Sequence, residues 1–252
     1  MSIRHNLSAV IVPIVLAFGL CAQSRPEVIK GIDKIGTEDQ LSEWLTYYYL
    51  HPRPDLVVSA TQFMSAQGLL LKPNTSTPFC TFLANVFAAN PARVETWFEE
   101  LRIGKEDQRS ALAFTLWRAN TTGSQGMLKV LSREGSASFQ KYVNELLADD
   151  RRPDFLHDEI NNSRFLDALW ASFFASGDER YVRRIIGALP LFNVHDDTAK
   201  MLIGGAAKWS LASNACQHPR VMEICEAELK ELPEDQRTAL AEVIQSAKEQ
   251  KK

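Results

Sequence analysis

The chain has 252 residues, of which 45% are hydrophobic and 23% are charged. This balance is typical of a folded globular protein and excludes a chain that is disordered over its whole length. The formal net charge is −3 at pH 7, and basic residues are mixed with acidic ones along the chain. No strongly basic surface is expected, so the composition argues against nucleic acid as a partner.

The first residues have the features of a secretory signal peptide. Arg4 precedes the apolar run Leu7–Leu20, which is shorter than the roughly 20 residues that a membrane-spanning helix needs. The small residues Ala22 and Ser24 occupy the positions that a signal peptidase recognises before its cleavage site. The predicted cleavage is therefore after Ser24 or, alternatively, after Ala22. We therefore expect residues 1–24 to be removed on export to the periplasm or the medium, which leaves no transmembrane segment.

Cys21 leaves a second interpretation of this leader open. A cysteine at the end of such an apolar run can be the acylated residue of a bacterial lipoprotein. In lipoproteins the residue before this cysteine is small, and here it is the bulky Leu20. Simple cleavage is the prediction, and a lipoprotein anchored through Cys21 is the alternative.

From residue 37 onward, apolar residues recur at helical spacing, and helix start signals separate the segments. These signals are capping residues or proline at a first turn: Thr37 with Gln40, Asp55, Thr77-Pro78, Asn90-Pro91, Ser136, and Asp196 or Asp197. No alternating pattern typical of strands occurs. The sequence predicts an all-α fold of about ten to twelve helices. We expect one domain over residues 25–252, with a possible joint near 149–159, where Pro153 and clustered charges interrupt the helical pattern.

Several helix pairs share a recurring sequence pattern. Bulky apolar residues are followed by one or two small residues, then by a turn, and then by a second helix with an apolar face. The clearest unit, Phe174–Leu189, has its turn at Gly177-Asp178 and its second face at Ile185 and Ile186. This unit resembles the turn and second helix of a HEAT-type repeat. The resemblance implies stacked antiparallel hairpins in an α-solenoid of the HEAT or TPR kind, and a surface that binds another molecule. It assigns no catalytic residues.

No sequence motif assigns a catalytic residue, a metal or a cofactor. The acidic cluster around His157 is interrupted by Arg151 and Arg152, which favours a solvated linker over a metal site. His195 stands beside two aspartates that are better explained as a helix cap than as partners of a catalytic base. Gly204-Gly205 lacks the residues of a phosphate loop and indicates close helix packing.

The aromatic run of Trp44 and Tyr47–Tyr49 has two interpretations. These four aromatic side chains point in several directions around a helix, and one helix cannot bury all of them alone. The rings could therefore line a ligand groove. Packing of helix ends and partner helices over the rings is the simpler alternative.

Cys216 and Cys225 are the candidate disulfide pair. Their closeness in sequence favours pairing in an oxidising compartment. A continuous helix opposes it, because Cys225 lies about 9 Å along a helix axis from Pro219 whereas bridged Cα atoms lie within about 7 Å. The bridge therefore requires the preceding helix to end before Cys216.

These features lead to one predicted function and one alternative. A helical surface without a catalytic motif predicts a non-catalytic binding or assembly protein of the bacterial cell envelope, whose partner is another protein or an envelope component. The alternative is a helical enzyme whose site is assembled from dispersed polar residues. Neither interpretation calls for a cofactor.

Overall fold

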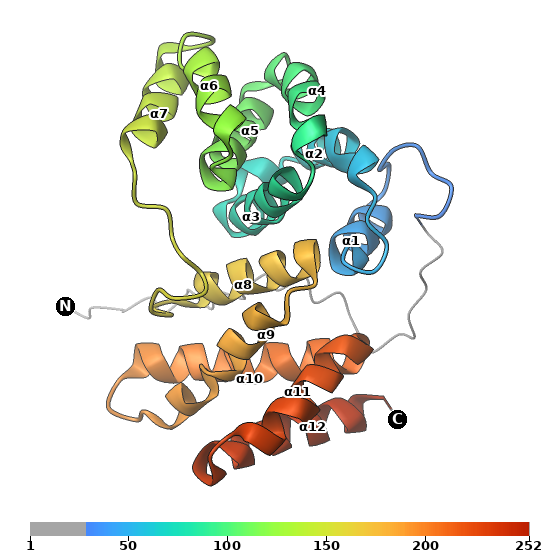
Figure 1. Cartoon of the computed structure of the whole chain (residues 1–252), viewed down its shortest axis with the longest axis vertical. Coiled ribbons are helices and arrows are strands. Elements are labelled where there is room, and N and C mark those ends of the chain that lie inside the picture. The colour runs from blue at the N-terminus through green and yellow to red at the C-terminus, as the bar shows by residue number, and fades with distance from the viewer. Residues whose placement is uncertain (1–28, 252) are drawn as a thin grey trace, which may run out of the picture.

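The computed structural model describes residues 29–251, and the predicted signal peptide and Cys21 lie outside this range. Within it, the chain forms twelve α-helices and three short 3-10 helices and has no strand (Figure 1). The predicted all-α class is therefore confirmed. In these residues, no helix combines the length and the apolar character needed to cross a membrane.

The helices follow one another with short connections. In the first part of the chain they are α1 (Glu38–Tyr47), η1 (Pro54–Leu56), α2 (Val57–Ala66), η2 (Leu69–Leu71), α3 (Pro73–Ala89), α4 (Pro91–Arg102), α5 (Glu106–Ala119), α6 (Thr122–Leu131) and α7 (Ala137–Ala148). In the second part they are α8 (Ser163–Ser176), α9 (Glu179–Ile186), η3 (Leu189–Asn193), α10 (Thr198–Gln217), α11 (Pro219–Glu231) and α12 (Glu234–Gln250).

Three of the six predicted helix starts are confirmed by a capping hydrogen bond. The side chains of Thr37, Ser136 and Asp197 accept hydrogen bonds from the backbone N–H three residues later, at the starts of α1, α7 and α10. Each bond satisfies a donor that has no partner inside the helix. α4 begins at Pro91, as its Asn90-Pro91 signal predicts.

Two predicted starts are wrong. α3 begins at Pro73 and continues through Pro78. Proline costs nothing in a first helical turn, but inside the helix Pro78 cannot donate to the carbonyl of Asn74. Asp55 caps no helix, because its carboxylate accepts hydrogen bonds from the Arg53 guanidinium at 2.6–3.0 Å.

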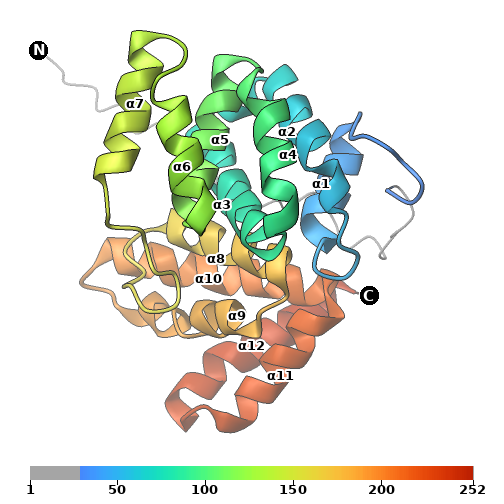
Figure 2. The same cartoon turned by 45° about the horizontal axis from the view of Figure 1, so that its top comes forward.

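α8 lies at the centre of the molecule (Figures 1 and 2). It packs against α1 and α3 on one side and against α9 and α10 on the other. The buried apolar side chains form one cluster with members from both parts of the chain. In a solenoid each repeat contacts only its neighbours, whereas α3 and α8 are distant in sequence. The expected stacking of hairpins is therefore not confirmed.

The predicted joint is a segment without a helix between α7 and α8. Its start is held against α5, where Trp117 Nε1 donates to the Asp149 carbonyl at 2.9 Å and Arg152 Nε donates to the Trp117 carbonyl at 2.7 Å. The single domain over residues 25–252 stays a prediction.

Candidate functional site

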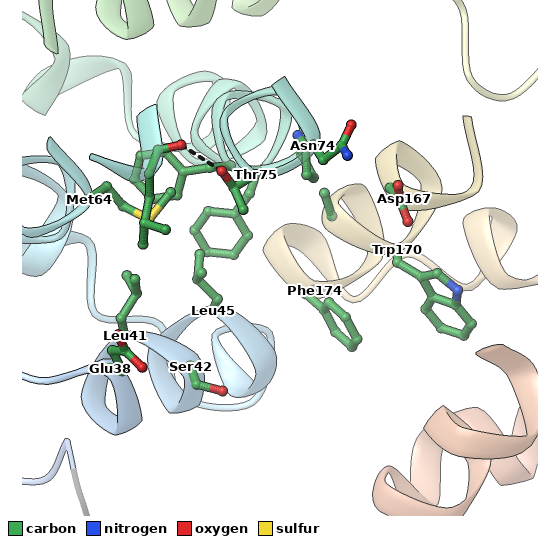
Figure 3. A pocket seen from close by; sticks show the side chains of 15 residues that line it. Glu38, Leu41, Ser42, Leu45, Met64, Asn74, Thr75, Asp167, Trp170 and Phe174 are labelled. Atoms are coloured by element: carbon green, nitrogen blue, oxygen red, sulfur yellow. Dashed lines mark hydrogen bonds between the residues drawn. The ribbon is translucent and has the colours of Figure 1, made fainter. Parts of the chain in front are cut away.

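A pocket of about 210 Å³ lies between α1, α3 and α8, and Met64 of α2 and Leu69 of η2 complete its lining (Figure 3). Most of the lining is apolar. We call the buried part the apolar wall; its residues are Leu41, Leu45, Met64, Phe79, Phe82, Trp170, Ala171 and Phe174. Such a concave, largely apolar space is the usual form of a small-molecule site.

Helical spacing explains why these residues share one surface. On α8, Asp167, Trp170, Ala171 and Phe174 stand at intervals of three and four residues, so their side chains leave the same face of the helix. The rings of Trp170 and Phe174 stack with centroids 5.7 Å apart and planes inclined by 22°. This stack gives the wall a fixed shape.

Partly or fully exposed polar residues form the polar rim, which consists of Glu38, Ser42, Asn74 and Thr75. The Thr75 hydroxyl already has hydrogen-bond partners within the protein, because it donates to the carbonyls of Leu69 at 2.6 Å and Lys72 at 2.9 Å. Figure 3 shows Glu38 and Asp167 on opposite sides of the pocket. The two carboxyl groups therefore do not converge on one point.

Asp167 is the unusual group of this pocket. Burial raises the pKa of its carboxyl to about 7, and the nearby charge of Arg164 opposes this shift only in part. Within residues 29–251, no side chain or backbone group forms a hydrogen bond or salt bridge with this carboxylate. A partly buried acid without a partner, next to an apolar cavity, is a candidate for contact with a ligand.

The aromatic run of Trp44 and Tyr47–Tyr49 does not line this pocket. Trp44 and Tyr48 are buried in the core, whereas Tyr47 and Tyr49 pack against His218. The pocket is instead lined by another face of α1, which carries Glu38, Leu41, Ser42 and Leu45.

The other residues singled out in the sequence do not form a common site. His157 Nδ1 lies 2.7 Å from an Asp154 carboxylate oxygen, and both side chains are exposed. His195 is also exposed, and the neighbouring Asp197 caps α10. Across residues 29–251, no three or more histidine, cysteine or acidic side chains are placed to hold a metal ion.

The proposed bridge between Cys216 and Cys225 is not formed. Cys225 is a free, fully buried cysteine. The bridge required the preceding helix to end before Cys216, but α10 continues to Gln217. Cys216 is therefore held in helical geometry, and Cys225 lies in α11 beyond Pro219.

A second cavity of about 380 Å³ lies between η2, α3, α5 and α7. Its lining includes Cys80, whose thiol pKa is raised to about 12 by burial. Because a thiolate is the reactive form of cysteine, this thiol is unreactive at neutral pH. Cys80 is therefore not an activated nucleophile in this cavity.

Sequence reasoning missed Asp167, although a signal was present. It is the only acidic residue between Ser163 and Ser176, and it stands three residues before Trp170 on an otherwise apolar face. An acid at such a position indicates either a partner or a functional contact.

Comparison with known proteins gives no match: no protein-family model, no curated protein and no solved structure is similar to this chain. The functional argument therefore rests on the pocket itself.

Proposed function

We propose that this chain is a non-catalytic binding protein of the bacterial cell envelope, and that the pocket between α1, α3 and α8 holds its ligand, a small and mostly apolar molecule. The observation that carries this proposal is the apolar wall with its polar rim around a space of about 210 Å³. The location is supported by the leader alone, with Arg4, the apolar run Leu7–Leu20 and Ser24.

The size of the pocket limits the ligand. An apolar cavity of about 150 Å³ holds benzene, which has six non-hydrogen atoms. By this measure a space of about 210 Å³ accommodates about eight or nine such atoms. Ligands of this size bind with dissociation constants on the order of 1 µM to 1 mM.

Binding is favoured over catalysis by the arrangement of titratable groups. General acid–base catalysis usually joins two groups that act on one substrate atom or on neighbouring atoms. Asp167 and Glu38 are the carboxyl groups in the lining, and they stand on opposite sides of the pocket. In the part of the chain that the structure describes, the lining contains no histidine, cysteine or lysine.

Titration of the purified protein with 1-octanol, followed by calorimetry, tests this proposal. We expect one binding site in the unchanged protein. The Ser42→Phe variant should weaken binding at least tenfold, because its ring would project from the polar rim into the pocket. Ser246→Phe is the matched control, since Ser246 is also a partly buried helical serine and does not line the pocket.

The control variant should bind octanol as the unchanged protein does, and both variants should keep their helical circular dichroism. Equal binding by Ser42→Phe and the unchanged protein would show that octanol does not occupy this pocket. Absence of any binding would contradict the proposed function.

A further inference from the structure

We infer that the ligand of this pocket is a small amphiphilic amine, whose ammonium group pairs with the Asp167 carboxylate while its apolar chain lies against Trp170 and Phe174. This inference rests on the proposed function, because it takes the pocket to be a binding site. It adds the chemical class of the ligand.

The position of Asp167 supplies the first argument. Its carboxylate leaves α8 from the same face as Trp170 and Phe174, so the charge and the apolar wall belong to one surface (Figure 3). One molecule with a polar end and an apolar body can therefore contact both. Asn74 and Thr75, which line the pocket from α3, are uncharged and bring no opposing cation.

Charge complementarity supplies the second argument. Among residues 29–251, no lysine or arginine lines the pocket, and the nearby Arg164 is exposed on the preceding turn of α8. Asp167 is partly buried. A carboxylate that has lost part of its hydration without gaining a partner is unfavourable, and pairing with a ligand cation offsets that penalty. A carboxylate ligand would instead be repelled by both Asp167 and Glu38. A neutral ligand could donate a hydrogen bond to Asp167 but would not neutralise its charge.

The protonation of Asp167 makes this pairing dependent on pH. Burial raises the pKa of the carboxyl to about 7, so the ionised fraction rises about tenfold between pH 6 and pH 8. An alkylamine stays protonated throughout this range, because amines of the lysine type have a pKa of about 10. Amine binding should therefore tighten as pH rises from 6 to 8. Of the residues that the structure describes, Glu38 on α1 and Arg164 on α8 are the other charged groups near this site.

The test compares three ligands with the same apolar chain: octylamine, 1-octanol and octanoate. Calorimetric titrations at pH 8 should show octylamine binding at least tenfold more tightly than octanol, and octanoate binding most weakly. Octylamine should lose up to tenfold in affinity at pH 6, whereas octanol should change less than threefold.

Two variants separate the role of Asp167 from general effects of charge. Asp167→Asn should reduce octylamine affinity to that of octanol and remove its dependence on pH. Glu95→Gln, which neutralises an exposed carboxyl group of α4 outside the lining, should preserve the preference for the amine. If Asp167→Asn fails to fold, the ligand series and pH dependence of the unchanged protein still decide the question.

The outcomes distinguish this inference from the proposed function. If octanol binds but octylamine binds no more tightly, or if octanoate binds as tightly as octylamine, the amine assignment is wrong while the binding pocket stands. If Asp167→Asn folds and keeps the preference, Asp167 is not the recognition group. If neither octanol nor octylamine binds, the proposed function itself is contradicted.

Discussion

His218 is a side chain whose protonation is set by burial. Its ring is fully buried, and Nδ1 lies 3.1 Å from the Tyr49 hydroxyl. The rings of Tyr47 and Phe174 pack with centroids 4.9 and 5.2 Å from the imidazole. Burial lowers the pKa of the imidazole to about 4. The folded protein therefore keeps His218 neutral at a pH at which an unfolded histidine is protonated.

We expect the contribution of His218 to the stability of the fold to decrease in mild acid. Between about pH 6.5 and pH 4 the unfolded chain binds the extra proton at this position, so the stabilisation present above pH 6.5 is lost as pH falls. At pH 4.5 the loss amounts to about 2.5 kcal/mol. Because Asp167 contributes in the opposite direction, the loss is measured as a difference between proteins. In urea unfolding at pH 7 and pH 4.5, His218→Phe should lose about 2.5 kcal/mol less stability than the unchanged protein.

The titration of Asp167 changes stability with pH in the direction opposite to that of His218, so a variant of Asp167 is the control. Because its pKa is raised, the folded state binds the extra proton between about pH 4 and pH 7, and its contribution to stability improves as pH falls. Asp167→Asn should therefore make the loss of stability in acid larger. An identical pH dependence for His218→Phe and the unchanged protein would show that His218 does not titrate as its burial implies.

The structural roles of some single residues could be predicted from the sequence, whereas those of others could not. The caps at Thr37, Ser136 and Asp197 depend on backbone groups three residues away, so local spacing predicts them. The Gln40 side chain, in contrast, accepts from the N–H of Gly36 at 2.8 Å rather than from Thr37. Asp167 could be seen as an acid on an apolar helix face, but its position in a pocket depends on α1 and α3, which local spacing does not place.

At the scale of elements, the neighbouring residues Gly204 and Gly205 lie on different faces of α10, and only one of them packs closely against η3. A Cβ built on Gly204 would lie 2.6 Å from the Leu191 carbonyl carbon and still closer to the Phe192 backbone nitrogen. On Gly205, the nearest atoms are those of the Phe192 side chain at 3.6 Å. The predicted close packing of these glycines is confirmed for Gly204, against the backbone of η3.

The two glycines should therefore respond differently to the same substitution. Gly204→Ala should destabilise the protein by roughly 2–4 kcal/mol, because α10 and the backbone of η3 must move apart. Gly205→Ala should be neutral or stabilise by up to about 1 kcal/mol, since alanine favours a helix more than glycine. Urea unfolding of both variants measures this. Similar stability of the two would contradict the packing of α10 against η3.

Helix existence could be predicted from periodicity, but two boundaries could not. Pro73 and Pro78 are both acceptable in a first helical turn, and local pattern does not decide which one starts α3. The predicted bridge between Cys216 and Cys225 likewise depended on where a helix boundary lies, in this case the end of α10. Asn214 can end a helix, but in the structure its side chain donates to the Ser210 carbonyl at 2.9 Å within α10. The helix then continues past Cys216.

The whole molecule is joined by contacts that no local pattern reveals. α3 and α8 pack together although α4 to α7 separate them in sequence. The resemblance of Phe174–Leu189 to a HEAT-type unit described one neighbouring pair, α8 and α9, and these helices do contact each other. It gave no information on the α3 interface. The pocket therefore could not be predicted, since its walls meet across this interface.

This central interface should hold the molecule together after the chain is cut. The Arg151 side chain is 93% exposed in the segment between α7 and α8. Arg152 is bound to the Trp117 carbonyl and is followed by Pro153, and trypsin does not cleave arginine–proline bonds. We expect limited trypsin digestion to cut after Arg151, with an Arg151→Gln variant resisting that cut.

The two fragments should then elute together from a size-exclusion column, because buried side chains of α3 and α8 belong to one apolar cluster. Separating them would expose that surface to water, at about 25 cal/mol for each Å² of apolar area. They should separate only in denaturant, where the cluster is lost. Fragments that elute separately in native buffer would show two independently stable halves, and would contradict both a single domain and a pocket built across it.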